Sequence, residues 1–244
     1  MAKTSETGHA INVANFEKLI SYLMGYGTRY NPSKDLIKIS NLQNVLTLTK
    51  GALDSVSMAQ SAYAGAVAAR KIVFEPLNKY ATRILNALRA SGSSEQIDAS
   101  AQSLVHKIQG VRASAKKSDE EKKALEAEGK EVTEISSAQT SFDNRLANFD
   151  KLVKLLATIP EYAPKEEDLK VATLTTYCTS LGNKNQEVIA AETALSNARI
   201  ARNKVLYEAN TGMTDVVADV KSYVKSVFEA SSPEYKQISK LSFS

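Results

Sequence analysis

Two arginines, Arg70 and Arg202, are the residues whose placement most suggests a specific role, because each interrupts the apolar stripe of a long predicted helix. A buried guanidinium needs a carboxylate or several carbonyl oxygens, since an unpaired charge is costly to remove from water. One interpretation is an ion pair that fixes the register between the two halves of the chain or between subunits. The other is that both side chains pack their aliphatic stems and carry their charged ends to solvent.

Other residues that commonly carry chemistry are few. The two histidines, His9 and His106, are not part of an H-x-x-x-H pattern, and there is no glycine-rich phosphate loop. The single cysteine, Cys178, lies next to the apolar stripe of its helix, where a small buried residue is a commoner role than a nucleophile. We therefore predict no catalytic, cofactor-binding or metal-binding residues, no cofactor, no small-molecule substrate and no enzymatic activity.

An internal repeat organises the helices that carry the two arginines. Shifting the sequence by 132 positions places residues 30–74 on residues 162–206, with 12 of 45 positions identical, and this superimposes Arg70 on Arg202. A repeat with a fixed period indicates a duplicated structural unit. We predict a tandem duplication with a first helical repeat at residues 1–112 and a second at residues 113–244, together forming one continuous elongated bundle.

The spacing of apolar residues predicts an all-α fold. Three long helices are expected at residues 33–75, 119–158 and 166–209, and shorter ones at 10–25, 77–90, 95–113 and 214–230, with a tail after residue 233. In the long helices the apolar positions alternate in steps of three and four, the period of a coiled coil, so we expect long antiparallel coiled-coil-like helices. We call these positions the seam of each helix: in the first repeat Leu42, Val45, Thr49, Ala52, Val56, Ala59, Tyr63, Ala66, Arg70 and Val73, and in the second Leu174, Tyr177, Leu181, Lys184, Val188, Ala191, Leu195, Ala198, Arg202 and Val205.

Composition narrows the classes of partner. Hydrophobic residues make up 43% of the chain and the net charge is +4, which gives no concentrated basic face of the kind that nucleic acids require. One cysteine permits no internal disulfide, no signal peptide is visible, and no apolar run is long enough to span a membrane. The expected location is cytoplasmic.

The second repeat also suggests a relationship. Its sequence contains Ala147-Asn148-Phe149, Tyr162-Ala163-Pro164, the run from Ala201 to Tyr207, Thr211 to Asp215 and Lys221 to Ser226. Across residues 140–243 it resembles a group of uncharacterised bacterial all-helical proteins. The resemblance implies no function and no site residues.

These observations lead to one functional expectation with two alternatives. We expect a non-enzymatic structural protein that self-assembles into a homo-oligomer or filament through its helical faces. The apolar strip between Met58 and Phe74 and the slightly basic first repeat also suit a membrane-active helical bundle, of the pore-forming or membrane-coating type, that acts at a membrane surface. A helical adaptor that binds another helix in its groove is the third possibility.

Overall fold

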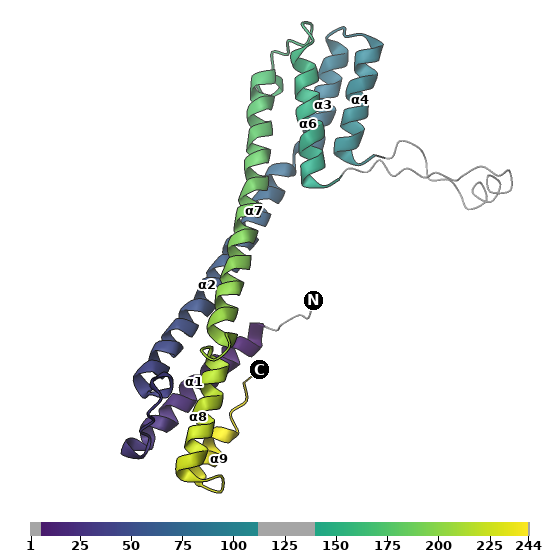
Figure 1. Cartoon of the computed structure of the whole chain (residues 1–244). Helices are drawn as coiled ribbons and strands as arrows, with labels where there is room; N and C mark the ends of the chain where they lie inside the picture. Colours follow the sequence, from purple (N-terminus) through teal and green to yellow (C-terminus); the bar gives the residue numbers. More distant parts are fainter. Residues whose placement is uncertain (1–5, 112–139, 244) are drawn as a thin grey trace, which may run out of the picture. The chain divides into compact units, whose positions relative to one another are not determined.

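The predicted all-α fold is confirmed. The computed structural model describes residues 6–111 and 140–243, and within these ranges it contains helices and turns but no strand (Figure 1). The helices are α1 (Glu6–Gly25), α2 (Ile39–Phe74), α3 (Leu77–Ala90), α4 (Glu95–Gln109), α6 (Phe142–Ala157), α7 (Val171–Tyr207), α8 (Met213–Phe228) and α9 (Pro233–Ser239). The part of the predicted 119–158 helix that precedes residue 140 lies outside the described residues.

The end of the chain differs from the prediction, because residues after 233 were expected to form a tail and instead include α9. Local sequence explains this helix. The Ser232 hydroxyl accepts a hydrogen bond from the backbone N–H of Tyr235, with 3.1 Å between the two heavy atoms, and so caps the helix. Pro233 occupies the first turn, where the proline ring fits the helical backbone without the loss of a hydrogen bond.

The two longest helices begin later than predicted, at Ile39 and Val171 rather than at residues 33 and 166. In each case a single 3-10 turn comes first, Asp35–Ile37 before α2 and Glu167–Leu169 before α7. The residue after each turn has an extended backbone, with ψ of 146° at Lys38 and 140° at Lys170, and this separates the turn from the helix.

The described chain forms two compact units, and each takes segments from both halves of the sequence. Unit 1 comprises residues 1–64 and 190–244, and unit 2 comprises residues 65–189. Helix α2 therefore has its first part in unit 1 and its last part in unit 2, whereas α7 has its first part in unit 2 and its last part in unit 1. The predicted repeat boundary at residue 112 is a boundary between similar stretches of sequence. The boundaries of the compact units lie elsewhere, within α2 and α7.

Unit 1 has a core in which residues of the first and last parts of the chain pack together. The N-terminal segment contributes Phe16, Leu19, Leu23, Ile37 and Leu42, among others, and the C-terminal segment contributes Leu206, Met213, Val217, Val220, Val224 and Ile238. Removal of these apolar side chains from water is the main favourable term in the folding of this unit.

Unit 2 has a core of similar design. Helices α3, α4 and α6 lie side by side with the first part of α7 (Figure 1). Its most deeply buried large side chains are Phe74, Leu77, Ile84, Leu88, Ile108, Phe149, Leu152, Leu156, Leu174 and Leu181.

The predicted seams of α2 and α7 face inward. Every one of the ten seam residues on each helix is buried or partly buried, including Arg70 and Arg202. Leu42, Val56, Leu174 and Val188, which the 132-residue shift pairs, are 0–4% exposed. The steps of three and four therefore identified the buried face of both helices.

Candidate functional site

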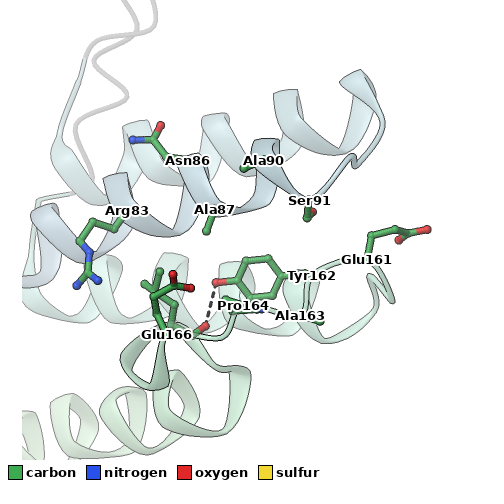
Figure 2. Close-up of a pocket in the computed structure, with 11 residues that line it drawn as sticks. Arg83, Asn86, Ala87, Ala90, Ser91, Glu161, Tyr162, Ala163, Pro164 and Glu166 are labelled. Atoms are coloured by element: carbon green, nitrogen blue, oxygen red, sulfur yellow. Dashed lines mark hydrogen bonds between the residues drawn. The ribbon is translucent and has the colours of Figure 1, made fainter.

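The turn between α6 and α7 in unit 2 forms one wall of a cavity. The side chain of Tyr162 is 6% exposed, and its hydroxyl donates a hydrogen bond of 2.9 Å to the carbonyl of Leu169. This bond closes the segment that connects the two helices and holds the ring in one orientation. Between the segment and α3 lies a cavity of about 510 Å³, lined in part by Ala87, Ala90 and Pro164 (Figure 2).

An ion pair ties the same turn to α3. Arg83 on α3 contacts both carboxylate oxygens of Asp168, and the Nη2–Oδ1 distance is 3.2 Å. The hydrogen bond from Arg83 lowers the pKa of Asp168 below its usual value. This geometry keeps the guanidinium at the edge of the cavity and engaged with a partner.

Tyr162 is held in its neutral form. Burial raises the pKa of its hydroxyl to about 12, and the nearby charges of Asp168 and Glu166 act in the same direction. A neutral phenol that already donates to a backbone carbonyl is poorly suited to act as a general base. Tyr162 therefore gives the cavity a fixed and neutral wall.

Unit 1 contains a turn with the same local geometry. The hydroxyl of Tyr30 donates a 2.6 Å hydrogen bond to the carbonyl of Ile37, seven residues later, as Tyr162 does to Leu169. An ion pair again joins the turn to a neighbouring helix, here between Lys34 and Asp219 on α8. The polarity is reversed, because unit 1 has the cation on the turn and unit 2 has the anion there.

Helix α8 in unit 1 takes the place that α3 has in unit 2. A shift of 136 residues superimposes Leu77 on Met213 and Arg83 on Asp219. The same shift pairs the buried residues Ala81 with Val217, Ile84 with Val220 and Leu88 with Val224. At this alignment both helices bury apolar residues at matching positions, and each carries one partner of an ion pair to the nearby turn.

One equivalent pair differs greatly in size, since the 136-residue shift places Ala87 on Tyr223. In unit 1 the Tyr223 ring packs edge to face against Tyr30, with 5.3 Å between centroids and 87° between planes. The backbone N–H of Asn31 donates a 3.2 Å hydrogen bond to the Tyr223 hydroxyl. In unit 2 the aligned residue is Ala87, whose side chain is much shorter than that of a tyrosine and lines the cavity.

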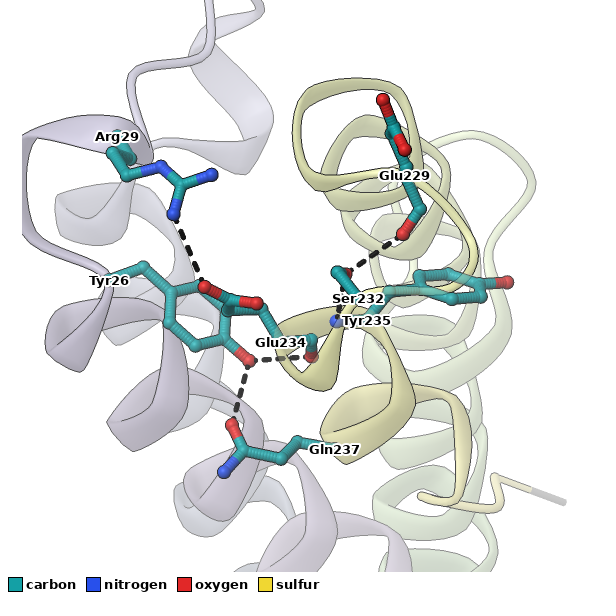
Figure 3. Close-up of polar contacts among 7 residues, drawn as sticks. All are labelled: Tyr26, Arg29, Glu229, Ser232, Glu234, Tyr235 and Gln237. Atoms are coloured by element: carbon teal, nitrogen blue, oxygen red, sulfur yellow. Dashed lines mark hydrogen bonds and ion pairs between the residues drawn. The ribbon is translucent and has the colours of Figure 1, made fainter.

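A second polar cluster in unit 1 joins the end of α1 to α9 (Figure 3). The Tyr26 hydroxyl donates to the carbonyl of Glu234 at 2.8 Å, and Arg29 pairs with the carboxylate of Glu234 at 3.2 Å. Arg29 also lies 4.1 Å from the centre of the Phe228 ring. This cluster holds the C-terminal helix against the N-terminal one, and we assign it a structural role.

The two arginines singled out from the sequence have different surroundings. The Arg70 guanidinium lies 4.2 Å from the centre of the Phe142 ring within unit 2. Arg202 in unit 1 is 3% exposed, and its Nε and Nη2 donate to the side-chain oxygen of Asn203 at 3.1 and 3.0 Å. The register-setting ion pair stays a prediction for both residues.

Cys178 lies on α7 in unit 2, where its sulfur is 3.9 Å from Oδ1 of Asp150 on α6. Burial, together with the Asp150 charge, raises the pKa of the thiol, which disfavours the nucleophilic thiolate. Within the described ranges, no three His, Cys, Asp or Glu side chains are grouped as a metal site. No described helix has a stretch long and apolar enough to cross a bilayer.

Comparison with known proteins adds no relative. Neither the models of protein families, nor the curated proteins, nor the solved structures contain a significant match to this chain. The candidate site is therefore defined by its own geometry.

Sequence reasoning missed the cavity and its equivalent in unit 1. The predicted repeat rests on identical residues at a shift of 132, whereas α3 and α8 share no identical residue at the shift of 136 that aligns their buried positions. The connection before α8 is longer than the one before α3, since residues 208–212 replace residues 75 and 76. A comparison of apolar spacing that allowed this insertion would have paired Ala87 with Tyr223.

Proposed function

We propose that this chain is a non-enzymatic structural protein, a duplicated coiled-coil-like helical scaffold that associates with itself through an exposed face of α2. The scaffold arises from two related repeats that exchange segments. Each compact unit combines the first half of one repeat with the second half of the other. Repeated features, such as the Tyr30 and Tyr162 turns and the α3 and α8 faces, support this duplication.

The observation that carries the proposed self-association is a second stripe on α2, separate from its seam. We call it the α2 face. Its residues recur in steps of three and four, carry no charge and are exposed apart from the partly buried Ala69: Leu48, Gly51, Ser55, Met58, Ala62, Gly65, Ala69 and Ile72. Met58 and Ile72 are each 67% exposed. Small residues in this pattern allow a second helix to approach closely, and the large apolar ones gain from burial.

Helix α7 lacks such a face, although it is the equivalent helix. The residues at the same positions include Asn183, Glu187, Asn197 and Lys204. No charged residue occurs in α2 from residue 55 to residue 69, whereas the matching part of α7 contains Glu187, Glu192 and Arg199. The difference favours α2 as the contact helix. Two identical α2 faces can pair about a two-fold axis.

The mass of the protein in solution tests this proposal. Multi-angle light scattering of the native protein should give at least twice the chain mass of 26.5 kDa. Ala62→Glu places a charge in the centre of the α2 face, and burial of an unpaired carboxylate costs several kcal/mol, so this variant should be monomeric. The matched control is Ala194→Glu at the equivalent exposed position of α7, which should keep the native mass.

Two results would contradict the proposal. One is a native protein that stays monomeric at high concentration. The other is binding of the native protein to anionic vesicles that Ala62→Glu abolishes, since this would assign the α2 face to a membrane surface instead of to a second copy.

A further inference from the structure

We propose that the cavity beside Tyr162 binds a single neutral phenolic ring, in the position that the ring of Tyr223 occupies in unit 1. This site is separate from the α2 face and goes beyond the proposed self-association. The protein has two corresponding corners where a helix meets a tyrosine turn: the Tyr30 corner is filled by Tyr223, and the Tyr162 corner is open beside Ala87.

The filled corner in unit 1 shows which kind of side chain packs against the buried tyrosine. Tyr223 packs its ring edge to face on Tyr30, an arrangement that aromatic pairs prefer because the positive edge of one ring meets the negative face of the other. Tyr30 is 7% exposed and is fixed by its bond to Ile37, so it provides a rigid platform. The occupant is thus one six-membered ring with a hydroxyl.

The open corner in unit 2 has a buried tyrosine, Tyr162, but no second ring among the described residues is packed against it. Tyr162 is as deeply buried as Tyr30 and is fixed by the equivalent bond to Leu169. Ala87 replaces the residue that would fill the space, and the cavity of about 510 Å³ adjoins both Ala87 and Tyr162 (Figure 2). A ring placed there would gain the contact that Tyr223 makes in unit 1 and would cover apolar surface of Ala87 and Pro164.

The polar lining limits the charge of the ligand. Glu161 and Glu166 both line the cavity (Figure 2). Arg83 is the one cation among the described lining residues, and it is already paired with Asp168. The two carboxylates oppose an anionic ligand. The hydroxyl would meet different partners from those in unit 1, because the N–H of Ala163, equivalent to that of Asn31, donates to the carbonyl of Glu161 at 3.0 Å. Recognition therefore depends mainly on the ring.

A phenolic ring can come from a free small molecule or from a tyrosine side chain of a peptide. Titrations of the full-length protein with p-cresol and with N-acetyltyrosinamide, followed by NMR, represent these two sources. We expect saturable shifts at Tyr162 with a dissociation constant on the order of 1 mM, given the few heavy atoms of the probes. Tighter binding of N-acetyltyrosinamide would identify a peptide tyrosine as the ligand, and tighter binding of p-cresol a free phenol.

Two variants test the position of the ring. Ala87→Tyr restores the residue found in unit 1 and should weaken binding at Tyr162 at least tenfold, while Thr82→Tyr, at an exposed position of α3 outside the cavity, should leave it unchanged. Tyr223→Ala opens the corner in unit 1 and should add a second p-cresol site at Tyr30. The proposal is overturned if neither probe shifts Tyr162, or if folded Ala87→Tyr protein binds as the native protein does.

Discussion

Two separately produced fragments, residues 1–111 and 112–244, are expected to fold only in each other's presence. Alone, each fragment should show little stable helix and no cooperative thermal transition by circular dichroism. When mixed they should form an equimolar complex, detected by native mass spectrometry, with the helical signal of the intact chain.

The composition of the two cores is the reason for this expectation. The core of unit 1 needs Phe16, Leu23 and Leu42 from one fragment and Met213 and Val220 from the other. The core of unit 2 likewise combines residues from both fragments. A helix whose apolar face has nothing to cover it is marginal in water, since most helical stability in proteins comes from packing.

Surface charges should also favour the mixed complex over pairs of identical fragments. The fragment 1–111 carries Lys34 and Arg83, so its self-pairing would bring two cations together at each turn. The fragment 112–244 carries Asp168 and Asp219, which would likewise repel each other. Each native pair is partly exposed, so solvent screens it and its own contribution to stability is small. A fully folded single fragment would contradict the exchange of segments between repeats.

Phe149→Ala and Phe16→Ala should each lower the free energy of unfolding by about 3–5 kcal/mol. Both side chains are 0% exposed, and truncation of a buried phenylalanine loses its transfer free energy and leaves a cavity. A shift of 133 residues places Phe16 on Phe149, and each residue belongs to the buried core of its unit. The two substitutions should therefore lower the free energy of unfolding by similar amounts.

Urea unfolding followed by circular dichroism measures these free energies. Ile11→Ala is a suitable control, because Ile11 is 56% exposed on α1 and its truncation should cost less than about 0.5 kcal/mol. A cost below 1 kcal/mol at either phenylalanine would show that its surroundings are not the packed core described for that unit.

Much of the fold was predictable because the signals were local. Helix α3 has the predicted limits, Leu77–Ala90, since Pro76 marks its start and a serine and glycine segment follows it. The seams of α2 and α7 were identified by spacing alone. The predictions of a tandem duplication, a coiled-coil geometry and self-assembly depend on relationships beyond one helix and stay proposals.

Other features could not be predicted because they depend on contacts between distant segments. The boundary between the two units falls within α2 and α7, but the local sequence of these helices does not mark it. The boundary depends on which distant segments pack together. The cavity is lined by Ala87 and Tyr162, and these residues are far apart in sequence. Lys34 and Asp219 likewise showed no pattern that linked them before the structure placed them in contact.

Both halves of the chain complete each compact unit, and zero-length cross-linking of the intact protein tests this arrangement most directly. A carbodiimide joins a lysine to a carboxylate only when the two are in contact, so mass spectrometry should find Lys34 linked to Asp219. Lys50 linked to Glu17, a 2.9 Å pair within the first 64 residues, is the positive control. A mixture of isotope-labelled and unlabelled protein separates links within one chain from links between chains. A Lys34–Asp219 link within single chains is the predicted result. Its absence from samples in which the Lys50–Glu17 link forms would contradict the account.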